Sequence, residues 1–290
     1  MKPPPFTYYR PADLVTAARM LAELGEGAKV LAGGQSLIPL MNFRLAAPEH
    51  LVDVNHLGLD AITMDDGEMV IGATVRHARL VQDPDVAAVH PLVAEAAGWI
   101  AHAVIRNRGT VCGSLAHGDP AAELPAVLAL LDGSVEVVAW RAGRLATRRV
   151  AASELFLGPL ETSLALDELA VAARFPLLGA RTGWALDELA RRKGDYALAG
   201  VALTVTVDAG GEPVAARAAY LSCAPTPVVV DLSPAVAGGA DVYDLVVDAL
   251  DPTDDIHATG AYRRHLAATL TARAVPTALA RARETAEVPA

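Results

Sequence analysis

Two glycine-rich segments are the part of this sequence best suited to chemistry with an anionic ligand. The first is Ala32-Gly33-Gly34-Gln35-Ser36, and the second is Gly109-Thr110-Val111-Cys112-Gly113-Ser114. Backbone without bulky side chains approaches a ligand closely and turns several N–H groups toward an anion. One such segment is common in turns. Two in one chain predict a long ligand whose diphosphate is held from both sides.

The side chains around the second segment add groups that bind phosphate and sugar. Arg106 and Arg108 are expected to neutralise phosphate charge. Thr110 and Ser114 are expected to donate hydrogen bonds to phosphate, and Glu123 to accept one from a ribose hydroxyl. The alternative makes both arginines solvated ion-pair partners. The first segment does not match the GxGxxG dinucleotide fingerprint, so its own alternative is an ordinary strand-to-helix turn.

The two cysteines, Cys112 and Cys223, limit the metal and redox chemistry of the chain. They lie far apart and form no CxxC pair, so they cannot supply a disulfide framework, a four-thiolate zinc site or an iron–sulfur cluster. Cys112 is either a reactive thiol or, as we expect of a free cysteine in a tight segment, a small buried filler. No HExxH or GxSxG motif is present, and we predict no metal site.

Composition excludes several other classes of function. The chain has 290 residues, 53% of them hydrophobic, and a net charge of −10. No basic cluster is interleaved with aromatic residues, which argues against nucleic acid and against an anionic membrane surface as partners. No apolar run approaches the ~20 residues of a membrane span, and the N-terminal residues lack the apolar run of a signal peptide. We therefore expect a cytoplasmic protein with no membrane span.

Apolar periodicity places the glycine segments between short strands and helices. A helical pattern from Leu14 to Leu24 ends at Gly25, and a strand over 29–31 runs directly into the first segment. Further strands are expected at 51–54, 69–72 and 169–175, a hairpin over 134–150, and helices within 75–103, broken by Pro84 and Pro91, and over 121–131. Strands and helices alternate irregularly, which predicts an α+β fold rather than a doubly wound parallel sheet.

A proline- and glycine-bounded stretch, 176–180, marks the expected domain boundary. The first domain would span 1–176, with subdomains of about 1–56 and 57–176, and a smaller domain would span 180–286. The second domain is expected to hold a hairpin over 199–221 and helices over 242–250 and 260–283. By itself, the segment Arg191-Arg192-Lys193-Gly194-Asp195-Tyr196 is typical of a charged helix end capped by glycine.

Several motifs together resemble a known family, in the same order along nearly the whole chain. They are Ala32-Gly33-Gly34-Gln35-Ser36-Leu37-Ile38-Pro39, Ile105-Arg106-Asn107-Arg108-Gly109-Thr110 and Arg192-Lys193-Gly194-Asp195-Tyr196-Ala197. They look like the flavin-binding medium subunits of molybdenum hydroxylases, a family that includes carbon monoxide dehydrogenase and xanthine dehydrogenase. The tail from Asp255 through Arg264 is similar to the C-terminal domain of that family.

The resemblance implies a two-subdomain, PCMH-like FAD-binding domain followed by a smaller C-terminal α+β domain. FAD would be held non-covalently between the two N-terminal subdomains. The residues implied around the pyrophosphate are Ala32, Gly33, Gly34, Gln35, Ser36, Leu37, Thr110, Cys112, Gly113 and Ser114. By the same resemblance, Glu123 would contact the adenosine half and Leu169 would lie near the flavin. Tyr196 would shield one face of the isoalloxazine ring.

The sequence departs from the family pattern at three places. Cys112-Gly113-Ser114 replaces the usual Gly-Gly-Asn, although the Ser114 hydroxyl still donates a hydrogen bond. Gln35 replaces the histidine typical of the carbon monoxide enzymes. Glu188 stands where many relatives carry a lysine, so no flavin role is assigned to Glu188.

The resemblance also implies partner subunits. Because this chain lacks the thiolates for even one four-cysteine cluster, [2Fe-2S] clusters and molybdopterin would lie on a small iron–sulfur subunit and a large molybdopterin subunit, assembled as a dimer of heterotrimers. Substrate would be hydroxylated on the partner, and this chain would pass the electrons through FAD to an external acceptor, with no catalytic residue for the substrate. Two alternatives stay open: a stand-alone FAD-dependent oxidase, and a flavin-free assembly scaffold, which the loss of Gly-Gly-Asn favours.

Overall fold

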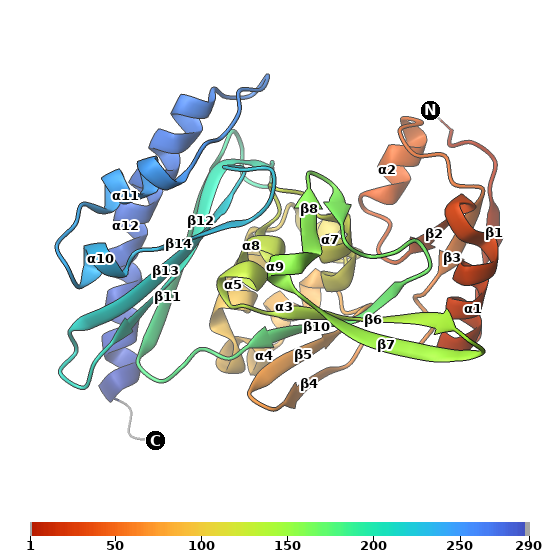
Figure 1. Ribbon diagram of the computed structural model, residues 1–290, viewed down its shortest axis with the longest axis horizontal. Helices are drawn as coiled ribbons and strands as arrows, with labels where there is room; N and C mark the ends of the chain where they lie inside the picture. The colour runs from red at the N-terminus through yellow and green to blue at the C-terminus, as the bar shows by residue number, and fades with distance from the viewer. Residues whose placement is uncertain (1, 288–290) are drawn as a thin grey trace.

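The structure is a computed structural model that describes residues 2–287. Residues 2–287 form three larger β-sheets arranged side by side and one two-stranded sheet, with helices packed between and against them (Figure 1). The chain passes through the sheets in order, from the N-terminal sheet at one end of the molecule to the C-terminal sheet at the other. This mixture of elements confirms the predicted α+β class.

The first sheet is small and entirely parallel, with strand order β1-β3-β2. Its strands are β1 (Thr7–Tyr9), β2 (Ala28–Leu31) and β3 (His50–Asp53). Helix α1 (Leu14–Leu24) buries Ala17, Ala18 and Leu21, and it ends in the 3₁₀ turn η1 (Gly25–Gly27). Asp13 begins the helix by accepting a hydrogen bond from the Thr16 N–H at 2.7 Å. Helix α2 (Leu37–Asn42) follows the first glycine segment.

The second sheet is antiparallel, with strand order β4-β5-β10-β6-β7. Its strands are β4 (Ile62–Asp65), β5 (Glu68–Gly72), β6 (Ser134–Arg141), β7 (Arg144–Ala151) and β10 (Leu169–Pro176). A two-stranded ribbon, β8 (Phe156–Gly158) with β9 (Glu161–Thr162), stands beside it. The central strand β10 comes last in sequence, so the sheet is complete only with the residues up to 176.

Seven short helices accompany the second sheet. They are α3 (His77–Gln82), α4 (Pro84–Val89), α5 (Pro91–Trp99), α6 (Ala103–Arg106), α7 (Val111–His117), α8 (Glu123–Leu130) and α9 (Ala152–Leu155). Pro84 and Pro91 each stand in the first turn of a new helix, as predicted for the breaks in 75–103. Helix α8 is buried nearly all round because it contacts the second sheet's core on one side and the third sheet on the other.

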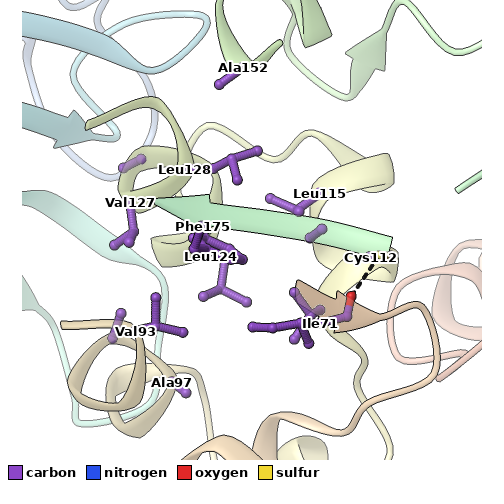
Figure 2. Packing of buried hydrophobic residues seen from close by; sticks show 14 of the residues in the cluster. Ile71, Val93, Ala97, Cys112, Leu115, Leu124, Val127, Leu128, Ala152 and Phe175 are labelled. Atoms are coloured by element: carbon purple, nitrogen blue, oxygen red, sulfur yellow. Dashed lines mark hydrogen bonds between the residues drawn. The ribbon is translucent and has the colours of Figure 1, made fainter. Parts of the chain in front are cut away.

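The core of this region is built around Phe175. Its ring is fully buried among Leu124, Val127 and Leu128 of α8, and Ile71 of β5 belongs to the same cluster (Figure 2). The Cys112 thiol faces this core and donates to the carbonyl oxygen of Ile71 at 4.0 Å (Figure 2). Helix α7, which carries the second glycine segment, is thereby fixed against the sheet.

The third sheet is antiparallel in the order β11-β12-β13-β14. Its elements are β11 (Thr182–Ala190), β12 (Ala197–Val207), β13 (Pro213–Leu221), β14 (Val228–Asp231), α10 (Ser233–Val236), α11 (Val242–Ala249) and α12 (Gly260–Glu287). Helix α12 lies along one face of the sheet (Figure 1). There the hydroxyl groups of buried Tyr220 and Thr271 share a hydrogen bond of 3.0 Å.

One local prediction is wrong. Residues 191–196 are not a helix end, because strand β11 precedes them and they form the turn into β12. Strand pairing with distant residues overrides the local sequence preference there. In the second glycine segment, residues 111–117 form helix α7 with Thr110 as its N-cap.

Phe175→Ala tests how strongly the central core stabilises the fold. Removing a fully buried phenylalanine ring leaves a cavity, so we expect the free energy of unfolding to fall by about 3–5 kcal/mol in urea denaturation. Phe43→Ala is the matched control, because Phe43 is 67% exposed, and its effect should stay within about 0.5 kcal/mol. Equal losses in the two variants would contradict this description of the core.

Candidate functional site

A cavity of about 660 Å³ lies between the first sheet, helix α7 and the turn from β11 to β12. Most of its wall comes from four stretches of the chain, within 28–37, 109–123, 160–170 and 194–196. All thirteen residues singled out from the sequence line it: Ala32, Gly33, Gly34, Gln35, Ser36, Leu37, Thr110, Cys112, Gly113, Ser114, Glu123, Leu169 and Tyr196. Residues up to 164 positions apart thus share one cavity.

The two glycine segments touch each other at the cavity wall. A β-carbon on Gly33 would overlap the carbonyl oxygen of Arg108 and would lie 2.8 Å from the Cα of Gly109. A β-carbon on Gly113 would lie 2.5 Å from Thr110 Oγ1, which accepts the Gly113 N–H at 3.2 Å. Glycine is therefore required at both positions by close packing of backbone on backbone and on a cap.

Asn55 and Arg76 hold the two segments together. Asn55 Nδ2 donates to the carbonyl oxygen of Ala32 at 2.9 Å, and Asn55 Oδ1 accepts from Arg76 Nη2 at 2.7 Å. The other terminal nitrogen of Arg76 donates to the carbonyl oxygen of Arg108. A continuous chain of hydrogen bonds thus joins the first segment to the second.

Asp53 orients this network. Its Oδ1 accepts from Asn55 Nδ2 at 2.6 Å, and its Oδ2 accepts from the Tyr8 hydroxyl at 2.5 Å. Burial by itself would raise the pKa of Asp53, but the hydrogen bonds from Tyr8 and Asn55 keep that pKa below its ordinary value. The ionised carboxylate therefore fixes the direction of the Asn55 amide.

Backbone N–H groups at the first segment are available to a ligand. Within residues 2–287, the N–H groups of Gly34, Gln35 and Ser36 have no hydrogen-bond acceptor. The Gln35 side chain turns back and donates to the carbonyl oxygen of Gly33 at 3.2 Å, which leaves its backbone N–H free. Adjacent N–H groups without acceptors are suited to the oxygens of a phosphate.

The cationic side chains differ from those expected. Arg106 and Arg108 do not line the cavity, so the prediction that they neutralise phosphate there is wrong. Arg106 Nη1 instead donates to the carbonyl oxygens of Ile100 and Ala101, both at 2.8 Å. Among the described residues that line the cavity, Lys29 is the one lysine or arginine. Sequence reasoning overlooks Lys29, although its place four residues before Gly33 is the signal that points to it.

Acidic groups gather at another part of the cavity wall. Glu123 at the start of α8 has a pKa raised to about 8, because burial and the neighbouring Glu188 carboxylate both disfavour its charged form. Burial, together with Asp187, raises the pKa of Glu188 to about 7, and Glu188 Oε2 has no hydrogen-bond partner among residues 2–287. This part of the wall therefore suits hydroxyl or amino donors rather than phosphate.

His77 and Cys112 are buried beside the glycine segments and uncharged. Burial lowers the pKa of His77 to about 4, and neither ring nitrogen has a partner within residues 2–287. Burial raises the pKa of the Cys112 thiol to about 12, which fits the buried filler expected of it and not a reactive thiolate. Sequence reasoning overlooks His77, because a lone histidine at a helix start carries no signal for a cavity.

The remaining wall is apolar and ends at an exposed tyrosine. Leu169 is buried at the start of β10, and Leu160, Leu164 and Leu166 extend the same wall. Tyr196 lines the cavity yet is 69% exposed, so its ring stands where the cavity opens to solvent. The cavity thus combines free N–H groups, carboxyl groups and an apolar wall with an aromatic residue at its opening.

Comparison with known proteins gives the family. Residues 4–178 match the family described as the FAD binding domain in molybdopterin dehydrogenase, and residues 184–278 match the CO dehydrogenase flavoprotein C-terminal domain. The chain is 40% identical to the 6-hydroxypseudooxynicotine dehydrogenase complex subunit alpha of Paenarthrobacter nicotinovorans, over 99% of each chain. It is 36% identical to the carbon monoxide dehydrogenase medium chain of Hydrogenophaga pseudoflava, over 97% of this chain and 99% of that one.

Solved structures agree with these matches. A chain of carbon monoxide dehydrogenase from Hydrogenophaga pseudoflava superposes with a TM-score of 0.90 at 36% identity, over 97% of this chain and 99% of that one. A chain of quinoline 2-oxidoreductase from Pseudomonas putida 86 gives a TM-score of 0.88 at 35% identity, over the same shares. The protein belongs to the family of FAD-binding oxidoreductase subunits of molybdopterin dehydrogenases. Within that family it is a medium subunit of the molybdenum hydroxylase type.

Two negative findings accompany the site. In the described part of the chain, no three or more histidine, cysteine or acidic side chains are grouped so as to hold a metal ion. Among the helices of residues 2–287, none combines the length and the apolar character that a membrane crossing requires.

Glu123 and Glu188 make stability depend on pH in a defined direction. A carboxyl group whose pKa is higher in the folded state stabilises the fold most at low pH, and this contribution is lost as the pH rises from about 4.5 toward about 8. Glu188→Gln should therefore flatten the pH profile and raise the free energy of unfolding at pH ~8 by about 1–3 kcal/mol. Urea titrations of the FAD-free chain between pH ~5 and pH ~8 measure this.

Glu284→Gln on the exposed side of α12 is the control for this measurement. It removes one formal charge without touching the cavity, so its pH profile should follow that of the unchanged protein. If the stability of Glu188→Gln depended on pH in the same way as that of Glu284→Gln, burial would not raise the pKa of Glu188 as described.

Proposed function

We propose that the cavity holds FAD and that the chain transfers electrons from partner iron–sulfur clusters to an external acceptor. The observation that carries this proposal is the contact of two glycine segments at one cavity, beside consecutive N–H groups that have no acceptor among residues 2–287. That donor set fits a diphosphate, and the carboxyl groups and apolar wall fit a ribose and a flavin.

Each part of the wall would have its own role toward FAD. The segment from Ala32 to Leu37 would bind the pyrophosphate through its free N–H groups, and Thr110, Cys112, Gly113 and Ser114 of the second segment would line the same site, with hydroxyl donors from Thr110 and Ser114. Glu123 would accept hydrogen bonds from the adenosine half. Leu169 would pack near the isoalloxazine ring, and Tyr196 would cover one of its faces.

Bound FAD supplies the redox chemistry, since it accepts electrons singly and passes them on singly or in pairs. The chain's own residues bind and orient it. The apolar wall at Leu169 keeps water from one side of the cavity, and the exposed ring of Tyr196 stands where an acceptor would approach. The raised pKa of Glu123, about 8, favours its protonated form at neutral pH and so limits negative charge beside an anionic cofactor.

The partners follow from the composition and the family. We propose a small iron–sulfur subunit and a large molybdopterin subunit, assembled with this chain as a dimer of heterotrimers in the cytoplasm. The two cysteines of this chain are buried and separate, so no cluster can be held here. Relatives named for nicotine, caffeine and carbon monoxide share this type of subunit, so we assign the choice of substrate to the large subunit.

We also propose a division into an FAD-binding domain over 1–176, with subdomains at about 1–56 and 57–176, and a C-terminal domain over 180–286. The hydrophobic clusters support it. One cluster gathers around α1 and the first sheet, a second around Phe175, and a third between the third sheet and α12. The boundary near 176–180 follows directly on the last strand of the second sheet.

Gly33→Ala tests FAD binding at the contact of the glycine segments. The added methyl group would force the first segment away from Arg108, so we expect the FAD dissociation constant to rise at least ~100-fold. The measurement is an absorption spectrum of the purified chain with excess FAD, before and after gel filtration, with fluorescence titration for affinity. Gly98→Ala is the control, since nothing lies within 4 Å of the added methyl group there.

A chain that stays colourless with FAD, alone and in the assembled complex, would overturn the electron-transfer proposal and favour the scaffold alternative. Equal FAD affinity in Gly33→Ala and Gly98→Ala would contradict the placement of the diphosphate at the glycine segments.

The isolated chain should bind FAD and yet fail to hydroxylate the substrate of the complex, because molybdenum chemistry lies on the partner. Product analysis by mass spectrometry, with the assembled complex as the positive control, measures this. Substrate oxidation by the purified chain with oxygen as acceptor would instead favour the stand-alone oxidase.

A further inference from the structure

We propose that Arg263 and Ser222 are positioning residues that set where Tyr196 and the segment 119–123 stand at the cavity. This inference rests on the proposed function only for its consequence, which is control of the flavin site. Its structural basis is a chain of hydrogen bonds from helix α12 to the cavity wall.

Arg263 is the buried starting point of this chain. It lies in the first turns of α12 and is 6% exposed. Its Nη1 donates to the carbonyl oxygens of Leu198 at 2.6 Å and Ser222 at 3.3 Å, and its Nη2 donates to Asp255 Oδ2 at 2.6 Å. The planar guanidinium therefore joins the start of β12, the end of β13 and the segment before α12.

Asp255 keeps the guanidinium in place. Its Oδ1 accepts from the N–H groups of His257 at 2.8 Å and Ala258 at 2.9 Å, while its Oδ2 receives Arg263. The Arg263 side chain and these backbone donors hold the pKa of Asp255 well below its ordinary value. Asp255 is thus ionised at physiological pH and keeps its contact with Arg263.

Ser222 carries the chain of bonds to the cavity. Its hydroxyl donates to the carbonyl oxygen of Ala197 at 2.7 Å, and its backbone N–H donates to the carbonyl oxygen of Pro120 at 2.9 Å. Ala197 follows Tyr196 directly, and Pro120 follows Asp119, which lines the cavity. One residue therefore ties both sides of the cavity opening to each other.

The backbone of Ser222 is held in an unfavourable conformation to do this. Its φ is +57°, in the left-handed region that non-glycine residues rarely adopt. Ser222 donates to Ala197 and Pro120 and accepts from Arg263, and these three hydrogen bonds compensate for that conformation. Because its hydroxyl and its N–H both form hydrogen bonds, Ser222 fixes the positions of Ala197 and Pro120 relative to each other.

The Tyr196 segment has a second support on its other side. Gly194 has a φ of +88°, and a β-carbon there would overlap the imidazole ring of His102. The segment 194–197 is therefore held between His102, from the N-terminal part of the chain, and Ser222. The position of Tyr196 is set from both parts of the chain at once.

The experiment compares four variants of the full chain, of which Arg263→Lys is the conservative one. Arg263→Met removes the guanidinium, and Ser222→Gly removes the hydroxyl while accepting the positive φ. Arg217→Met is the matched control, because it breaks a two-bond ion pair with Asp132 that also joins β13 to the N-terminal part but touches no cavity residue. Amide hydrogen exchange of FAD-free protein reports on the segments 119–124 and 194–198, and FAD titration with visible circular dichroism reports on the flavin.

We expect exchange to quicken about tenfold in both segments of Arg263→Met and in the segment 194–198 of Ser222→Gly, whose backbone N–H still reaches Pro120, and in neither segment of Arg217→Met. We expect a roughly tenfold rise in the FAD dissociation constant and an altered visible dichroism in the same two variants. Arg263→Lys, which keeps the ion pair but not the fork of donors, should fall between.

Unchanged exchange in the segment 194–198 of Ser222→Gly, or equal quickening in Arg217→Met, would overturn the proposal. Failure of the unchanged protein to bind FAD would contradict the proposed function instead, and the exchange measurement would still decide the positioning role.

Discussion

The contact between Gly33 and the Arg108–Gly109 backbone is the constraint on which the site depends. It brings two segments more than seventy residues apart to one cavity wall, and it leaves no room for a side chain between them. Hydrogen bonds from Asn55 and Arg76 hold this contact from behind, and the ionised Asp53 orients Asn55. The glycine segments at the cavity are therefore held from behind by a charged network.

Two parts of the cavity wall differ in the charge that they offer a ligand. Free N–H groups and Lys29 lie at the cavity, while Arg106 is bonded to the carbonyl oxygens of Ile100 and Ala101 instead. Carboxyl groups with raised pKa values gather around Glu123, where a ribose or an adenine would offer donors. A single long ligand with an anionic middle and a neutral end matches this arrangement, which is why the family's FAD fits the residues present.

The C-terminal part of the chain contributes residues to the cavity wall. Tyr196 lies in the turn between β11 and β12 of the third sheet, and the bonds of Ser222 reach both Ala197 and Pro120. Helix α8, which begins with Glu123, packs against the second sheet on one side and the third on the other. The contacts of α8 and of Ser222 therefore fix the positions of Glu123 and Tyr196 relative to both parts of the chain.

The sequence by itself determined the α+β class, the first glycine segment after a strand, the helix breaks at Pro84 and Pro91, and the family, because these depend on local backbone preferences and on motifs read in order. It could not place Arg106 outside the cavity, find His77 at its wall, or show that residues 182–190 pair as a strand with 197–206. Nor did it reveal the link from Arg263 through Ser222 to the cavity. These features depend on contacts between residues distant in sequence, and only the tertiary structure decides which distant groups meet.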